Sequence, residues 1–245
     1  MFKSVLKKIL YNLWPSNLLN PQQEVDTWVT RKLSELPAGA RILDAGAGPQ
    51  PYRKYCKHLK YVSQDFAAYD GKGDGTALQA DGFSYKGLDI VSDICSIPEP
   101  DESFDAVLCT EVFEHIPDPA GALKEFFRLL KPGGKIVLTA PFFSLSHFSP
   151  YHFVSGLSRY WWDHWLVKVG YSKFDIVSSG GFFDFLAQLV KITPGISKKY
   201  SRHIIQIPIL YFQCIVMILL LSFSKHRNDR SNELVCFGHF IYAEK

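Results

Sequence analysis

The segment Arg41–Pro49, RILDAGAGP, constrains the fold more than any other part of the chain, together with Asp65, which follows Asp44 by 21 residues. Its apolar residues end in an acid, and Gly46 and Gly48 then precede a proline. This order predicts a buried parallel strand, a tight turn and a helix N-terminus, which bring the backbone close to a nucleotide-like ligand. Asp65 ends the next expected strand, where a carboxylate accepts hydrogen bonds from both hydroxyls of a ribose.

The spacing of the glycines separates two kinds of cofactor. A dinucleotide fingerprint has a third glycine three positions after the second, where this chain has Pro51. Asp44 would repel a pyrophosphate, whereas it would not repel a ligand with a sulfonium and a free amino group. The pattern therefore favours S-adenosylmethionine (SAM) over NAD, and the simpler alternative is an ordinary turn between a strand and a helix.

Composition bounds the size and the compartment of the protein. With 245 residues, 47% of them hydrophobic, the chain is expected to form one large domain or one domain plus an appendage. Its five cysteines are scattered and form no paired spacing. This distribution argues against a disulfide framework or a zinc site and favours a reducing compartment.

Positive charge gathers at both ends of the chain. Residues 1–60 carry ten basic and four acidic side chains, residues 61–194 carry ten and seventeen, and residues 195–230 carry six and one. In residues 1–21, apolar side chains form one stripe of an expected amphipathic helix, with Lys7 and Lys8 opposite. The two lysines interrupt any signal-peptide core, so the helix is expected either to pack on its own domain or to lie in a membrane surface.

A second apolar stretch, residues 204–224, contains no charged side chain and has basic residues on both sides. Its length would reach across the ~30 Å hydrocarbon layer of a bilayer. Pro208 and two glutamines weaken a simple span, and a span would place the following strand on the wrong side of the membrane to join its sheet. We therefore expect a segment that lies against one leaflet or dips into it, and the alternative is a helix pair buried beneath the sheet.

The order of expected elements indicates an α/β fold. Helices are expected at 22–36, 51–59 and 119–131, strands at 41–44, 61–65, 88–93, 103–111 and 135–141, and a loop or lid at 66–87. Alternating strands and helices predict a mostly parallel sheet that is covered on both faces. The expected organisation is an N-terminal amphipathic helix (1–21), a cofactor-binding core (22–180), an apolar helical insertion (181–230) and a final strand (231–245).

Five segments in this order resemble a class I SAM-dependent methyltransferase of the broad type 11 group: ILDAGAG, YVSQDF, VSDICSIP, SFDAVLCTEVFEHIPDP and LLKPGGKIVLTAPF. The resemblance covers about residues 38–180. It implies a Rossmann-like, mostly parallel, seven-stranded sheet with helices on both faces. Its first motif would hold the methionine end of SAM through Asp44, Gly46 and Gly48.

The resemblance assigns further residues to the cofactor. Asp65 would bind the ribose, and Asp93 with Ile94 would contact the adenine. Glu111, at the end of the fourth expected strand, would face the cleft. The chain departs from the family at Pro49–Pro51, which replaces a longer glycine loop and leaves the fit of the carboxylate end of SAM in question.

Candidate acceptor and catalytic residues follow the fourth and fifth expected strands, whose ends face the ligand crevice. His147 or His152 could act as the general base for a hydroxyl acceptor, and Glu111 is a further candidate catalytic residue. Each histidine could equally bind a loop carbonyl, and His115 is expected to cap the turn 116–119. The same region offers Arg159 for an anionic acceptor group and Trp161 beside it. A metal site from His147, His152 and His164 is not expected, because no matching carboxylate or cysteine spacing accompanies them.

The sequence therefore predicts a SAM-dependent methyltransferase for a small or lipid-linked acceptor, such as a hydroxyl of a glycan or quinone precursor. We expect it in the cytoplasm, peripheral to the inner face of an anionic membrane. The alternatives are an NAD-dependent oxidoreductase and a non-catalytic membrane-associated module with the same fold. Nucleic acid is not expected as a partner, because the basic ends border apolar runs rather than a basic–aromatic groove.

Overall fold

The computed structural model describes residues 21–80, 82–200, 207–224 and 230–245. The expected helix at 1–21 lies outside the described residues, except for Pro21. The chain divides into two compact units. We call Val25–Val177 with Gly238–Lys245 the α/β unit, and Ser178–Phe237 with Met1–Glu24 the helical unit.

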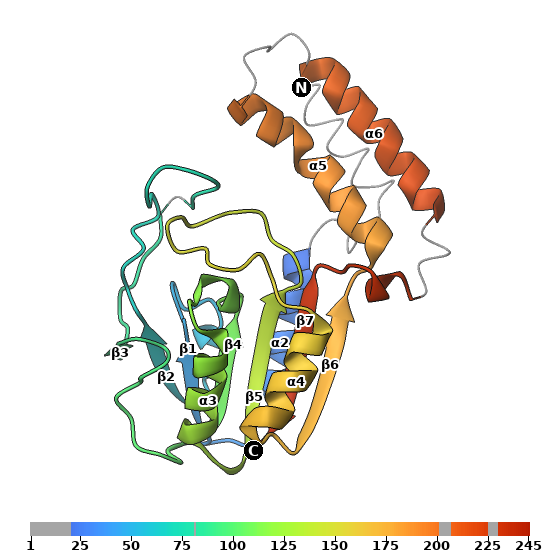
Figure 1. Cartoon of the computed structure of the whole chain (residues 1–245). Helices are drawn as coiled ribbons and strands as arrows, with labels where there is room; N and C mark the ends of the chain where they lie inside the picture. The colour runs from blue at the N-terminus through green and yellow to red at the C-terminus, as the bar shows by residue number, and fades with distance from the viewer. Residues whose placement is uncertain (1–20, 81, 201–206, 225–229) are drawn as a thin grey trace. The chain divides into compact units, whose positions relative to one another are not determined.

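A seven-stranded sheet runs through the α/β unit in the order β3-β2-β1-β4-β5-β7-β6. The strands are β1 (Arg41–Ala45), β2 (Lys60–Asp65), β3 (Ile90–Val91), β4 (Phe104–Thr110), β5 (Leu130–Pro141), β6 (Lys173–Ser179) and β7 (Gly238–Glu244). Strands β1 to β5 pair in parallel, and β7 pairs antiparallel to β5. The mostly parallel, seven-stranded sheet expected from the sequence is therefore confirmed (Figure 1).

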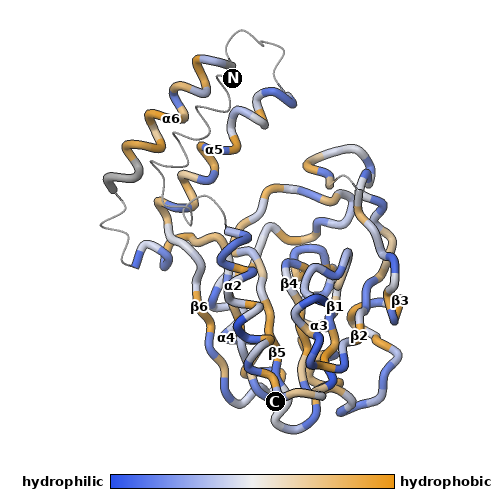
Figure 2. The backbone as a smooth tube through the Cα atoms, turned by 180° about the vertical axis from the view of Figure 1, so that it is seen from behind, coloured by the Kyte–Doolittle hydropathy of each residue, from blue (hydrophilic) through white to orange (hydrophobic). Residues whose placement is uncertain are grey.

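Helices cover both faces of this sheet because its strands are apolar on both sides. Leu43 and Ala45 of β1 share a buried cluster with α3 (Pro119–Leu129) and α4 (Arg159–Val169). Ile42, which points to the opposite face, shares a second cluster with α2 (Pro21–Ser34). This near-continuous run of apolar residues is typical of a parallel strand that is buried on both faces, and Figure 2 shows the central strands as hydrophobic.

Local capping sets the starts of the two front helices. The Asp118 carboxylate accepts a hydrogen bond from Gly121 N, and Pro119 supplies a pre-set φ at the first position of α3. Ser158 caps α4 in the same way, and Gly170 ends that helix in the left-handed conformation. The two N-caps, Asp118 and Ser158, fix where α3 and α4 begin, next to the edge of the sheet that carries the site.

Two sequence-based elements differ from the structure. The helix expected at 51–59 is absent, and turns with a short 3-10 helix (Arg53–Tyr55) take its place. Gln50, between Pro49 and Pro51, has a φ of 58°, so the chain turns at the point where the helix was expected to begin. The third strand is also shorter than expected and keeps only Ile90–Val91.

The helical unit contains two long helices, α5 (Phe182–Tyr200) and α6 (Ile207–Ser224), which contact each other. They run in opposite directions (Figure 1). Cys214 and Ile218 of α6 are buried, whereas Ile209 and Phe212 are 61% and 68% exposed. None of the described helices combines the length and the apolar character needed to cross a bilayer.

Candidate functional site

A cavity of about 570 Å³ opens at the carboxyl ends of β1, β2, β3 and β4. It is lined by residues from these strand ends and from two long loops. Five of the residues predicted for cofactor binding or catalysis line it: Gly46, Asp65, Asp93, Ile94 and Glu111. The open edge of a parallel sheet has therefore gathered side chains that are far apart in the sequence.

The turn after β1 is held tightly against β2. Gly46 has a φ of 73°, and its N–H donates to the Gln64 carbonyl at 2.9 Å. A Cβ at Gly46 would lie 2.6 Å from a methyl group of Val112, so only glycine fits. The Gly48 N–H donates to Asp65 Oδ2 at 2.9 Å, although Gly48 itself does not line the cavity.

Asp65 joins this turn to the cavity. Its Oδ1 accepts a second bond from the Ala67 N–H at 3.0 Å, so each carboxylate oxygen has one partner. Burial raises the pKa of Asp65, and the backbone N–H donors act in the opposite direction. Because a carboxylate oxygen can accept more than one hydrogen bond, Asp65 can still accept from ligand hydroxyl groups.

Asp44 lies behind the cavity rather than in its wall. Its carboxylate is buried and accepts a hydrogen bond from the Tyr61 hydroxyl at 2.5 Å. Burial raises the pKa of Asp44 to about 7, against the opposing effect of the Tyr61 bond. The bond to Tyr61 ties the Asp44 side chain to β2, and its predicted contact with the cofactor stays a prediction.

The rim of the cavity consists of two loops, which we call rim segment A (66–80 and 82–89) and rim segment B (142–156). They pair through backbone bonds from Leu78 N to the Ser146 carbonyl, at 3.1 Å, and from Phe148 N to the Leu78 carbonyl, at 2.8 Å. Figure 1 shows the two loops side by side beyond the strand ends. Rim segment A contains no helix or strand within its described residues, as expected for 66–87.

Aromatic side chains from the two rim segments form much of the cavity wall, and the sequence analysis did not select them. Phe148 stacks on Tyr69 with ring centroids 4.7 Å apart. Further aromatic lining comes from Phe66, Phe83, Tyr85, Tyr151 and Phe153. The only sequence signal was the density of aromatic residues in both loops, which does not say that the loops meet.

Glu111 follows β4 directly and lines the cavity. Its φ of 52° is uncommon for a residue with a side chain. Burial raises the pKa of the Glu111 carboxyl group. A half-buried carboxyl group on a strained backbone at a strand end suits a residue that exchanges protons with a ligand.

His115 also lines the cavity, but it does not cap the turn 116–119 as expected. Its Nδ1 instead donates to the Tyr151 carbonyl at 2.6 Å, while Asp118 caps α3. Burial lowers the pKa of His115 to about 4, so the ring is neutral near pH 7. The rings of His147 and His152 lie 4.6 and 6.1 Å from it, outside the cavity lining.

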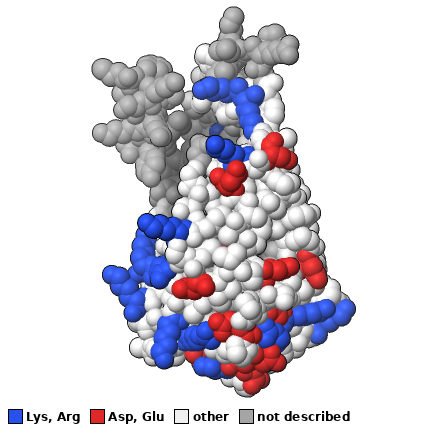
Figure 3. Space-filling view, turned by 90° about the vertical axis from the view of Figure 1, so that its left-hand side faces the viewer, with Lys and Arg blue, Asp and Glu red and all other residues white. Residues whose placement is uncertain are grey.

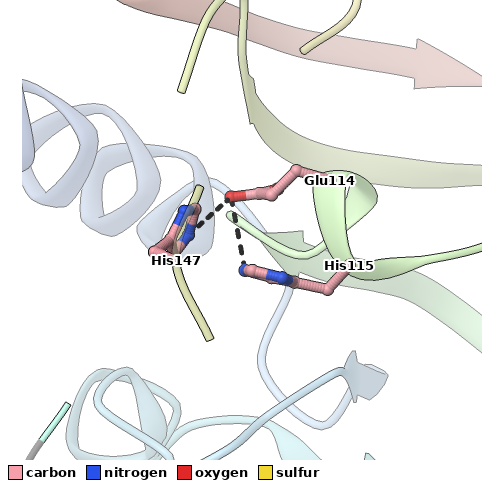
Figure 4. A group of neighbouring side chains, drawn as sticks. All are labelled: Glu114, His115 and His147. Carbon is pink, nitrogen blue, oxygen red and sulfur yellow. Dashed lines mark ion pairs between the residues drawn. The ribbon is translucent and has the colours of Figure 1, made fainter. Parts of the chain in front are cut away.

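Glu114 faces these histidines from the first turn after β4 (Figure 4). Its Oε1 lies 3.7 Å from His115 Nε2 and 3.8 Å from His147 Nε2. Burial raises the pKa of Glu114 well above its ordinary value, and the nearby Glu111 adds to the effect. The sequence did not single out Glu114, because only the fold places His147 of rim segment B close to it.

Three other candidates lie elsewhere in the α/β unit. Arg159 donates to the Ile176 carbonyl and pairs with Asp163 on α4, and Trp161 packs against Phe113 in the core. Neither residue lines the cavity. His164 is exposed on α4 beside Trp165.

Oppositely charged side chains pair at the end of the sheet opposite the cavity. Arg128 pairs with Asp101, and Lys131 pairs with Asp105, at the end of the sheet where β4 begins. In Figure 3, side chains of both signs gather at this end of the α/β unit, and the face shown has no unbroken basic surface.

Comparison with known proteins identifies this fold and its motifs. Residues 43–138 match the sequence profile of a family described as "Methyltransferase domain". The similarity over these residues is to a methyltransferase domain. The matched residues run from β1 into β5 and include the glycine turn, Asp65, Asp93 and Glu111 of the cavity wall.

Two curated proteins that resemble this chain carry names that specify different acceptor atoms. The chain is 37% identical over 109 residues to a ubiquinone biosynthesis O-methyltransferase from Xanthomonas oryzae pv. oryzae, which spans 42% of this chain and 43% of that protein. It is 35% identical over 99 residues to a sterol 24-C-methyltransferase from Aspergillus fumigatus, spanning 39% and 26% of the two chains. The aligned part is thus less than half of either relative.

The fold extends beyond the matched motifs. The crystal structure of a SAM-dependent methyltransferase from Archaeoglobus fulgidus superposes with a TM-score of 0.57 and 16% identity, over 91% of this chain and 94% of that one. At this identity the similarity establishes the fold, which agrees with the Rossmann-like sheet expected from the sequence.

Proposed function

We propose that the protein is a SAM-dependent methyltransferase whose cofactor lies in the cavity at the strand ends. One observation carries the proposal. Asp65, Asp93 and Glu111 line the cavity, whereas no lysine or arginine among the described residues does. An acidic, aromatic wall favours a sulfonium and an ammonium group, whereas it offers no cation for the pyrophosphate of NAD.

The residue assignment follows the geometry of the turn. The ribose hydroxyls of SAM would donate to Asp65, and the adenine would lie between Asp93 and Ile94 beyond β3. The methionine end would approach Gly46, where the absence of a side chain leaves backbone accessible. Asp44 would support this turn from beneath through its bond to Tyr61.

Calorimetry with SAM and with NAD tests the cofactor. Wild-type protein should bind SAM and not NAD. Asp65→Asn should weaken SAM binding by about 1.5–3 kcal/mol, because a charged acceptor of ribose hydroxyls becomes a neutral amide. Asp89→Asn is the matched control, since Asp89 accepts from Ser63 and lies outside the cavity lining. Tighter binding of NAD than of SAM would refute the assignment.

For the acceptor we propose a hydroxyl group on a small or lipid-linked molecule, such as a quinone or glycan precursor. The aromatic rim fits a planar or apolar body, and the O-methyltransferase relative supports oxygen as the acceptor atom. Glu111 is the predicted catalytic residue that lines the cavity, so we assign it as the general base. A base at this position commonly contributes ~10²–10⁴-fold to the rate.

We also propose that the helical unit contacts an anionic membrane from the cytoplasmic side. The outer face of α6 exposes apolar side chains at helical spacing, namely Ile209, Phe212, Val216 and Leu220. Lys198 and Lys199 are exposed at the end of α5. Apolar side chains next to lysines match the boundary between acyl chains and anionic headgroups.

A further inference from the structure

Glu114, His115 and His147 form a cluster whose polar atoms do not satisfy one another. Glu114 is 3% exposed, and its Oε2 has no hydrogen-bond partner among the described residues. The Nε2 of His115 is likewise buried without a partner in the described part of the chain. Buried polar atoms are nearly always paired, so this cluster calls for a group that binds all three side chains.

The tautomers of both histidines are set by backbone carbonyls. His115 Nδ1 lies 2.6 Å from the Tyr151 carbonyl, and His147 Nδ1 lies 2.8 Å from the Leu145 carbonyl. A carbonyl can only accept, so each Nδ1 carries a proton, and the Nε2 atom of each ring faces the Glu114 carboxyl group. In the neutral form of the ring this Nε2 atom carries a lone pair. A backbone carbonyl on the second nitrogen is the usual partner of a metal-binding histidine.

The distances exclude direct hydrogen bonds and fit a shared cation. Glu114 Oε1 is 3.7 and 3.8 Å from the two Nε2 atoms, beyond hydrogen-bond range. One ligand atom from each of the three residues lies within 4.8 Å of the others. Ligand atoms ~2.0–2.2 Å from a tetrahedral ion are roughly 3.3–3.6 Å apart, so small side-chain shifts would close the shell.

We propose that Glu114, His115 and His147 bind a first-row divalent transition-metal ion, such as Zn²⁺, beside the cavity. Two imidazoles and one carboxylate favour such an ion over Mg²⁺ or Ca²⁺, which prefer oxygen ligands. Three protein ligands leave a coordination position for water or an acceptor oxygen, and His115 places the site at the cavity wall. The proposed SAM site does not use these three side chains, and metal binding would give them a role.

Titration of chelator-treated, full-length protein with Zn²⁺ alone tests the site. We expect one equivalent to bind with micromolar or tighter affinity and to raise the melting temperature, while Mg²⁺ at the same concentration does neither. Glu114→Gln, which keeps the size of the side chain, and His147→Asn should each weaken binding by ~10-fold or more. His164→Asn, an exposed histidine outside the cluster, should leave it unchanged.

Several outcomes would overturn the proposal. The first is that the wild-type protein does not bind Zn²⁺ even at millimolar Zn²⁺. The second is that Glu114→Gln and His147→Asn bind Zn²⁺ with the same affinity as the wild type. The third is that only His164→Asn loses Zn²⁺ binding. The variants are judged only where they melt cooperatively and still bind SAM, and the wild-type titration decides the proposal if they do not fold. Because the titration contains no SAM, its failure leaves the cofactor proposal untouched, and the Asp65 experiment leaves the metal proposal untouched.

Discussion

At the scale of single residues, Gly46 lines the cavity at a position that leaves no room for a side chain. The backbone at Gly46 is in the left-handed region, with a φ of 73°, which strains any residue with a side chain. An added Cβ would also lie 2.6 and 2.7 Å from the two methyl groups of Val112. We expect Gly46→Ala to lower the free energy of unfolding by about 2–5 kcal/mol, the sum of backbone strain and overpacking. Denaturant melts and SAM calorimetry measure the two consequences, loss of stability and loss of binding.

Gly39→Ala is the matched control for Gly46→Ala. Gly39 has a φ of 81° with nothing within 4 Å of an added Cβ, so this variant carries backbone strain alone. It should cost about 1–2 kcal/mol and leave SAM binding intact. Adding Val112→Ala to Gly46→Ala should recover part of the stability, and strictly additive effects would contradict the proposed clash.

The buried Asp44 predicts a pH dependence of stability. Its pKa is about 7 in the folded protein against an ordinary value of 3.8, so the folded state binds more protons than the unfolded state between these values. The free energy of unfolding therefore falls as the pH rises from 4 to 7. Asn at this position keeps an acceptor for Tyr61 and carries no charge.

We therefore expect Asp44→Asn to gain stability relative to wild type by about 1–3 kcal/mol between pH 5 and pH 8. Urea melts of both proteins at the two pH values give the difference. The opposite trend, with the variant losing relative stability as the pH rises, would mean that the Asp44 carboxylate is favourably paired in its charged form.

At the scale of elements, the two rim segments are joined by Ser149. Its hydroxyl donates to Asp74 Oδ1 at 2.8 Å and accepts from Gln79 Nε2 at 2.9 Å. Ser149→Ala should loosen rim segment A, which raises amide exchange at 66–80 and weakens SAM binding several-fold, with little change in global stability. Ser172→Ala, at the opposite end of the sheet, is the control. Unchanged exchange in rim segment A would show that the backbone pairing suffices.

At the scale of the whole molecule, the exposed face of α6 predicts membrane binding. Full-length protein should co-sediment with anionic vesicles, and Phe212→Asp combined with Val216→Asp should weaken this binding by ~10-fold or more. Salt should reduce the binding only in part, because the apolar contribution remains. Tyr160→Asp, which changes an apolar side chain 82% exposed in the α/β unit, is the control. Wild-type protein that stays in the supernatant at low salt would refute the contact.

Local segments of the sequence were enough to predict the strand and the glycine turn beside the cavity, whereas cofactor binding by these residues stays a prediction. Gly46, Gly48 and Asp65 belong to one strand–turn unit and the strand beside it, and the order of β1 and β2 follows from a short connection. Hydrophobic runs that are buried on both faces predicted the parallel sheet, because few other arrangements cover both sides of such strands.

Only the tertiary structure decided which loops meet above the sheet and which polar side chains they bring together. Leu78 pairs with rim segment B across about 70 residues of sequence, and this pairing builds the aromatic wall. The same loop returns His147 to Glu114 and His115, which were read as unrelated residues. Such contacts depend on the summed packing of the whole sheet rather than on local propensity, so no spacing in the chain encodes them. The sequence by itself determined the strand–turn motif and the sheet, and tertiary packing determined the cavity wall, the burial of Asp44 and the histidine–glutamate cluster.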